Sequence, residues 1–129
     1  MSDTDDEASA WLAKGRADLA MARALAADSA LPPWGACYHA QQSAEKAIKA
    51  LLVLADVDPP KSHNLRTLVD LLTSRDTVPA DDHELADLTR WAIVGRYPAP
   101  FPEPSPDDAR AAIRVADRII GLLGQRLDR

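Results

Sequence analysis

The 129 residues fit one domain, and a hydrophobic content of 47% suffices for a single continuous core, which leaves no room in this chain for a second domain. The formal net charge of −5 comes mostly from residues 1–7, which hold four of the 20 acidic side chains and leave 16 against 15 basic ones elsewhere. A nearly neutral body disfavours tight nonspecific nucleic-acid binding, so any RNA or nucleotide contact requires a local group of Lys and Arg.

The single cysteine, Cys37, excludes an internal disulfide and offers no cysteine pair for a zinc site. The acidic start lacks the basic and then apolar pattern of a secretory signal, and no apolar run approaches the roughly 20 residues of a membrane span. We therefore expect a cytoplasmic protein without a membrane segment. Residues 1–7 should be frayed or disordered, and residues 8–129 should form one helical domain.

The first two predicted helices are separated by prolines. A proline-free stretch from about Glu7 to Ala27 repeats small and apolar residues at four-three spacing, which predicts a helix. Pro32 and Pro33 end it, because proline cannot donate a backbone hydrogen bond. A second helix is predicted from near Trp34 to Ala55, and its wide apolar arc indicates the most buried helix. The arc consists of Cys37, Ala40, Ala44, Ala47, Ile48, Leu51, Leu52 and Ala55.

A narrow polar stripe lies opposite this arc and is formed by Tyr38, Gln42, Glu45, Lys46 and Lys49. The simplest interpretation is a solvated face, on which Glu45 and Lys49 form an ion pair worth only about 0.3–0.5 kcal/mol. The alternative is that Lys46 and Lys49 lie beside a groove and meet phosphate charge, while Gln42 hydrogen bonds to ribose or base.

After a loop over residues 56–64, Ser62 or Asn64 caps a short helix that carries Leu65, Leu68, Val69 and Leu72. The next helix starts with a capping box, in which Asp81 accepts a backbone hydrogen bond and Glu84 reaches back. This helix should end near Gly95.

Prolines alternate with other residues from Pro98 to Pro106 and keep that connection extended. Ser105 then caps the last helix, whose first turn holds a proline and two acids. Its buried side is marked by Ile113, Ala116, Ile120 and Leu123. The predicted fold class is therefore all-α, an up-down bundle of four long helices with one extra short helix.

Three segments together resemble the HEPN family, in their order and spacing as well as their residues. They are residues 40–52 (AQQSAEKAIKALL), residues 62–65 (SHNL), and Arg96-Tyr97-Pro98. The resemblance extends from about Trp11 to Leu123. It implies a bundle that commonly forms a homodimer, with polar residues of the second and later helices facing a shared groove. Members of the family bind nucleotides, act with minimal nucleotidyltransferases, or cleave RNA without metal as toxins.

The ribonuclease members carry an arginine followed after four to six residues by a histidine. The arginine would hold the scissile phosphate, and the histidine would exchange protons with the attacking or leaving oxygen. Here residues 101–103 stand at the corresponding distance after Arg96 and include no histidine, and none follows Arg90 at that spacing. The resemblance fails at the catalytic step unless His63 or His39 acts from elsewhere in space.

We therefore expect a non-catalytic HEPN-type module that binds a nucleotide or phosphate-bearing ligand and pairs with a separately encoded minimal nucleotidyltransferase, as in a toxin–antitoxin pair. The candidate ligand-binding residues are Gln42, Lys46, Lys49, His63 and Arg96. Arg96 either clamps phosphate or forms a structural salt bridge. His63 either contacts the ligand or anchors its loop by hydrogen bonding to backbone. No cofactor or metal is expected, because three scattered histidines lack spaced carboxylate partners.

Two alternatives remain open. One is a metal-independent ribonuclease toxin with a displaced histidine, in which Arg96 and His63 would be catalytic. The other is a plain helical dimerisation or adaptor domain. In either case His39 and His83 are expected at the surface, and the tryptophans are expected to anchor the core or a dimer interface. These are Trp11, Trp34 and Trp91.

Overall fold

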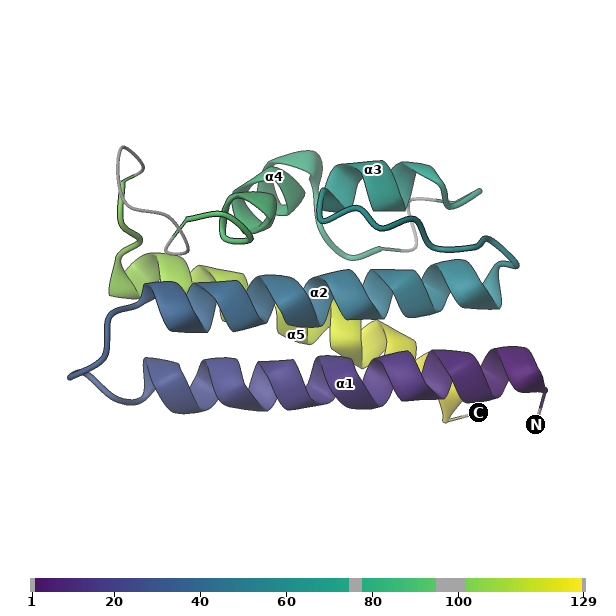
Figure 1. The fold of residues 1–129 in the computed structure, drawn as a ribbon, viewed down its shortest axis with the longest axis horizontal. Coiled ribbons are helices and arrows are strands. Elements are labelled where there is room, and N and C mark those ends of the chain that lie inside the picture. Colours follow the sequence, from purple (N-terminus) through teal and green to yellow (C-terminus); the bar gives the residue numbers. More distant parts are fainter. Residues whose placement is uncertain (1, 75–77, 95–101, 129) are drawn as a thin grey trace.

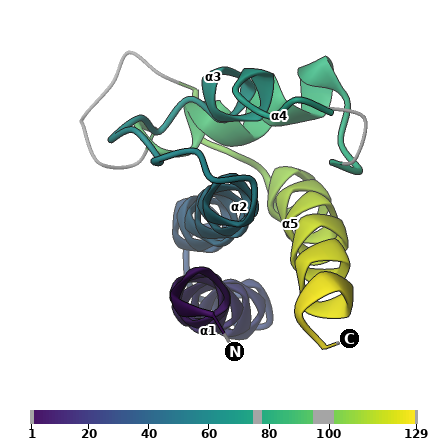
Figure 2. The ribbon, with the colours of Figure 1, turned by 90° about the vertical axis from the view of Figure 1, so that its right-hand side faces the viewer.

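The structure, a computed structural model, describes residues 2–74, 78–94 and 102–128, and these contain five helices. In chain order they are α1 (Asp3–Ala26), α2 (Trp34–Leu54), α3 (Leu65–Asp70), α4 (Asp82–Arg90) and α5 (Pro106–Leu127). Figure 1 shows α1 and α2 running side by side, with the two short helices α3 and α4 on the other side of α2. The view along the bundle in Figure 2 places α5 beside α1 and α2. The all-α bundle is confirmed.

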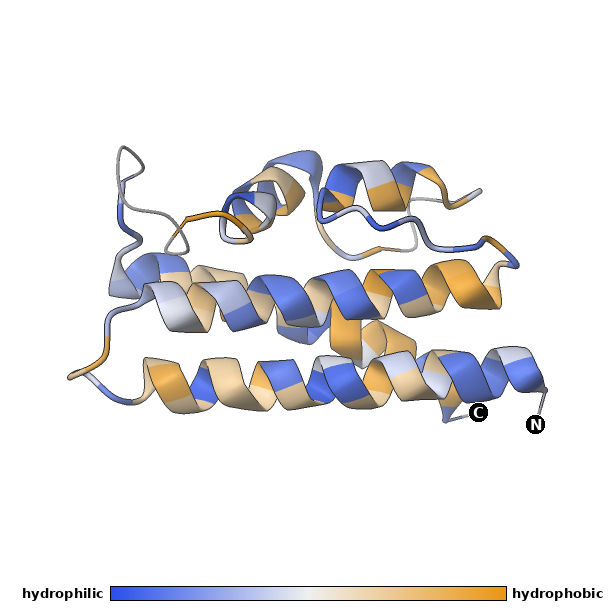
Figure 3. Ribbon diagram, in the orientation of Figure 1, coloured by the Kyte–Doolittle hydropathy of each residue, from blue (hydrophilic) through white to orange (hydrophobic). Residues whose placement is uncertain are grey.

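The α2 helix is the centre of the bundle and packs against all four other helices. The expected arc of α2 is buried except for Ala55, which caps the C-terminus of the helix and is exposed. Figure 3 shows the C-terminal end of α2 as a hydrophobic stretch, whereas hydrophilic residues interrupt α1 and the rest of α2. Because α2 is enclosed on several sides, polar side chains on it are also buried, namely Gln41, Ser43, Glu45 and Lys49.

The first helix begins earlier than expected. Ser2 is the N-cap of α1, and its hydroxyl accepts a hydrogen bond from the backbone N–H of Asp5 at 3.1 Å. Asp3, Asp5 and Asp6 lie in the first turn, where negative charge is favourable at the positive end of the helix dipole. Residues 3–7, which we expected to be frayed or disordered, are therefore helical.

The predicted caps of the later helices are confirmed. Asn64, rather than Ser62, caps α3 by accepting from the backbone N–H of Thr67 at 3.2 Å. Asp81 and Glu84 form the capping box of α4. Ser105 caps α5 in a second capping box, whose reciprocal acceptor is the side chain of Asp108.

The fourth helix is shorter than predicted, because it ends at Arg90 instead of near Gly95, which lies outside the described residues. The backbone N–H groups of Trp91, Ala92 and Ile93 each donate to the carbonyl three residues earlier, which tightens the chain into turns. These turns bury Trp91 in the core. The bundle thus has three long helices and two short ones among the described residues.

Of the other tryptophans, Trp11 is partly buried against the core and Trp34 is exposed. No helix among the described residues combines the length and apolar character that crossing a membrane requires.

Candidate functional site

The polar stripe of α2 is not the solvated face that its spacing suggests. The side chains of Glu45 and Lys49 are only 6% and 10% exposed. They are covered because α1 and the loop before α3 pack against this side of α2. Trp11 on α1 has its ring centroid 5.8 Å from the Lys49 ammonium nitrogen, and His63 in the loop contacts Glu45. The expectation of a water-exposed ion pair is therefore wrong for these two residues.

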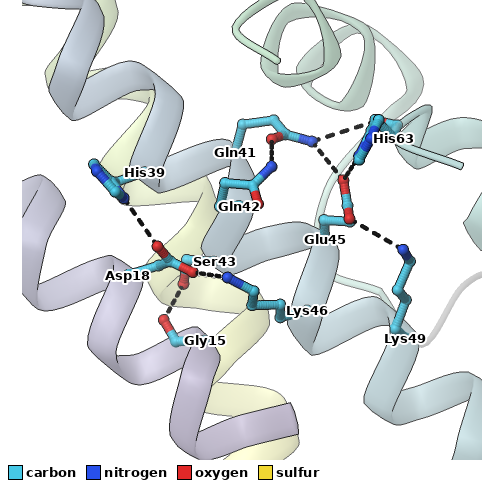
Figure 4. A network of polar contacts seen from close by, with 10 residues as sticks. All are labelled: Gly15, Asp18, His39, Gln41, Gln42, Ser43, Glu45, Lys46, Lys49 and His63. Atoms are coloured by element: carbon cyan, nitrogen blue, oxygen red, sulfur yellow. Dashed lines mark hydrogen bonds and ion pairs between the residues drawn. The ribbon is translucent and has the colours of Figure 1, made fainter. Parts of the chain in front are cut away.

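Glu45 is the centre of one cluster, which Figure 4 shows with its hydrogen bonds. Its Oε1 lies 2.8 Å from His63 Nδ1 and accepts from Gln41 Nε2 at 3.1 Å, and its Oε2 accepts from Lys49 Nζ at 3.1 Å. Gln41 also donates to the backbone carbonyl of His63 at 3.3 Å, and Gln42 Nε2 donates to Gln41 Oε1 at 2.7 Å. The cluster ties the loop before α3 to α2.

Asp18 on α1 is the centre of a second cluster. Its carboxylate is 6% exposed, and its Oδ1 lies 2.9 Å from His39 Nδ1. The Lys46 ammonium pairs with the other carboxylate oxygen, Oδ2. Nearby, Ser43 Oγ donates to the backbone carbonyl of Gly15 at 2.8 Å. This cluster holds α1 against α2.

Gly15 permits the close approach of these two helices. A Cβ at this position would lie 2.9 Å from Ile120 Cδ1 and 3.3 Å from the backbone oxygen of Ser43. Both distances are shorter than ordinary van der Waals contact, so a larger residue would push α1 away from its neighbours. The second cluster depends on this spacing.

The two clusters have the same arrangement of charged groups. In each, a buried carboxylate meets one lysine and the Nδ1 atom of one histidine. A buried charge is tolerated when it is paired and hydrogen bonded, and these contacts supply that compensation. Both lysines therefore have their charge offset by a carboxylate. The most open polar group of the network is His63, whose side chain is 61% exposed.

The structure brings three of the five sequence candidates into one network, because Gln42, Lys49 and His63 are joined through Gln41 and Glu45. Lys46 belongs to the other cluster. Arg96 lies outside the described residues.

The candidate histidines also differ from expectation. His63 does connect its loop to α2, but its ring contacts a carboxylate, and its own backbone carbonyl accepts the second bond. His39 is only partly exposed, because Asp18 holds it, whereas His83 is at the surface as expected, with 87% of its side chain exposed.

Sequence reasoning missed Asp18, Gln41 and the pairing of His39. A signal for Asp18 was present, since it falls three residues after Gly15 and four before Ala22 on the buried side of the first helix. A charge at such a position requires a partner. Gln41 likewise falls within the apolar arc of α2. Within the described residues, no group of three or more His, Cys, Asp or Glu is placed to hold a metal ion.

Comparisons with known proteins agree with the helical fold and identify the family of the chain. No curated protein matches the chain. Among solved structures, TT1696 from Thermus thermophilus has 25% sequence identity and a TM-score of 0.76, over 93% of this chain and 98% of that one. ST0689, described as an archaeal HEPN homologue, has 26% identity and a TM-score of 0.62, over 98% and 99%. The sequence pattern of the HEPN domain matches residues 8–126, and the chain therefore belongs to the HEPN domain family.

Proposed function

We propose that the chain is a non-catalytic HEPN module that binds a nucleotide or another phosphate-bearing ligand and acts with a separately encoded minimal nucleotidyltransferase. The observation that carries the proposal is the contact between Glu45 and His63. The imidazole is fixed through Nδ1 on a buried carboxylate while most of its side chain stays open to solvent. A carboxylate partner on one ring nitrogen orients the other nitrogen toward a ligand.

His63 Nε2 has no hydrogen-bond partner among the described residues. When the ring is protonated, this nitrogen donates a charge-assisted hydrogen bond to a phosphate oxygen. Gln42 belongs to the same cluster and is only partly buried, so its amide supplies a further contact. Lys46 and Lys49 then act indirectly, by pairing with the carboxylates of Asp18 and Glu45 and holding them in place.

The proposal retains Arg96 as a phosphate clamp, since a guanidinium binds phosphate in a bidentate manner. It includes no catalytic step, since no histidine follows an arginine in the sequence at the spacing of the ribonuclease members. It also includes a homodimer, which light scattering tests directly. The expected mass is twice the 14.0 kDa of one chain, and a monomer at working concentration would refute this part.

Calorimetric titration with ATP, GTP and a short RNA tests the ligand. We expect saturable heat at millimolar ligand or below, and an affinity at least about fivefold weaker for His63→Gln, because a charge-assisted hydrogen bond is lost. His83→Gln is the matched control, since the same substitution is made at a histidine outside the network. The absence of heat with all three ligands would refute the ligand-binding part and leave the dimerisation or adaptor role.

Co-purification followed by mass spectrometry tests the partner. The chain is expressed in its native host with an affinity tag, and a small nucleotidyltransferase should be enriched over a control purification. If the chain repeatedly purifies without any nucleotidyltransferase while remaining folded, the partnership is wrong.

A ribonuclease is the second candidate, and one observation favours it. A buried carboxylate on Nδ1 of an exposed histidine is also the arrangement that orients a general base. Labelled RNA is incubated with the protein in EDTA. Cleavage by the wild type and by His83→Gln, but not by His63→Gln or Arg96→Ala, would replace the non-catalytic proposal with this one.

A further inference from the structure

A cleft lies between α4 and α5, separate from the polar network. Figures 1 and 2 both show α4 above the first half of α5. The cleft has a volume of about 480 Å³, which falls within the usual range for small-molecule sites. Its lining comes from α4, the turn that follows it, and α5, and includes no residue of the two carboxylate clusters.

The floor of the cleft is apolar. It is formed by Leu88 and Trp91 from the α4 side and by Ala112 and Val115 from α5, all of which are buried. The rim is charged, with side chains of both signs. An apolar floor can hold the apolar body of a small ligand, and charged groups at the rim can orient it.

Most charges on the rim are satisfied within the protein. Each of the following carboxylates has a partner: Glu84 pairs with Arg118, Asp117 pairs with Arg23, and Asp108 accepts from the backbone N–H of Ser105. Asp87 lies 3.4 Å from His83 Nε2 and 3.8 Å from Arg90 Nη1. The ion pairs offset the charges of Glu84 and Asp117, whereas the hydrogen bond to Asp108 satisfies an oxygen without removing its charge.

Two guanidinium groups on the rim differ from the rest. Arg114 on α5 forms no ion pair or hydrogen bond with the described residues, although it lines the cleft. Arg90 touches Asp87 only at 3.8 Å, and its guanidinium carbon lies 5.1 Å from the ring centroid of Trp91. Both retain N–H donors, and a guanidinium matches the geometry of a carboxylate or phosphate group.

We propose that this cleft binds a small amphipathic anion, a molecule with a flat apolar body and one carboxylate, sulfonate or phosphate group. The apolar body packs on the floor beside Trp91 and Val115, and the anionic group pairs with Arg114, with Arg90 as second donor. The proposal does not depend on the ligand proposed for His63, because the two sites share no residue.

Fluorescence titration of the full chain with the aromatic sulfonate 8-anilinonaphthalene-1-sulfonate tests the cleft. We expect a saturable rise in emission and an affinity weakened about five- to tenfold in Arg114→Gln. Ala111→Trp should abolish binding, because Ala111 is exposed on the rim and the indole would fill the cleft. Arg110→Gln is the matched control, since Arg110 lies one turn away, pairs with Asp107 and does not line the cleft.

Two further measurements complete the test. Competition with 1-naphthoate and with AMP distinguishes an aromatic carboxylate from a nucleotide, and displacement by either supports the proposal. His63→Gln should bind the probe like the wild type, whatever its effect on nucleotide binding. Thermal melts confirm that each variant is folded. The proposal is overturned if emission does not saturate, if neither compound displaces the probe at millimolar concentration, or if Arg114→Gln binds as tightly as Arg110→Gln.

Discussion

Replacing Lys46 by methionine should destabilise the protein strongly, although the residue looks like an ordinary surface lysine in the sequence. The substitution keeps an unbranched side chain of similar length and removes the ammonium group, with its charge and its hydrogen-bond donors. It leaves the Asp18 carboxylate, which is 6% exposed, with His39 Nδ1 at 2.9 Å as its remaining partner. A buried carboxylate that loses a cation carries an uncompensated cost of desolvation.

The expected loss in the free energy of unfolding is about 2–3 kcal/mol. Breaking one side of a buried ion pair generally costs about 3–5 kcal/mol, and the loss here falls just below that range because His39 still contacts the carboxylate. For a chain of this length, that loss lowers the melting temperature by about 10 °C. Urea denaturation followed by circular dichroism measures the free energy directly.

A double-mutant cycle separates the pair from the lysine itself. Adding Asp18→Asn to Lys46→Met removes the unpaired charge, so the double variant should recover to within about 1 kcal/mol of the wild type. Arg23→Met is the control, because Arg23 and Asp117 also join two helices but are 55% and 56% exposed, and it should cost less than about 1 kcal/mol. If Lys46→Met costs no more than Arg23→Met, or if the cycle is additive, our assignment of a buried pair fails.

One labelling experiment and three further variants test burial, packing and capping. Burial, with a smaller effect from the Asp108 charge, raises the pKa of the Cys37 thiol to about 12, so its thiolate is scarce at pH 8. Iodoacetamide should therefore label Cys37 at least about a hundredfold faster in urea than in the folded protein. Gly121→Ala should raise the free energy of unfolding by about 0.5–1 kcal/mol, since no atom lies within 4 Å of the added Cβ, whereas Gly15→Val should lower it by about 2 kcal/mol in the same urea assay. Ser105→Ala removes the cap of α5 and should lower the melting temperature by about 4 °C, equivalent to about 1 kcal/mol; an unchanged melt would mean that the capping box contributes nothing.

The helices were predictable because the signals that begin them are local. Asn64, Asp81 and Ser105 each accept from the backbone N–H three residues later, so their role can be predicted without knowing the fold. The end of α4 was not predictable in the same way. No proline or glycine marks Arg90 as the last helical residue. The turns that follow bury Trp91, and this burial depends on contacts with the whole core.

The candidate site was predictable only in part, since its burial depends on contacts distant in sequence. The period of the second helix correctly grouped Gln42, Glu45 and Lys49 on one side. It could not show that the loop carrying His63 folds over that side, because the contact with Glu45 spans 18 residues. For the same reason the partner of Lys46, which lies 28 residues earlier in α1, was missed.

Anion binding depends on the charges that remain after internal pairing, which a sequence does not display. In α2, Lys46 and Lys49 form the most conspicuous basic group of the chain, yet each is offset by a buried carboxylate. In α5, nothing in the sequence distinguishes Arg114 from the other arginines of the helix. In the structure the nearby carboxylates of Glu84, Asp108 and Asp117 have partners, whereas Arg114 has none among the described residues. The open groups are therefore His63 at one site and Arg114 at the other. For this reason the two ligand proposals use these residues rather than the lysines.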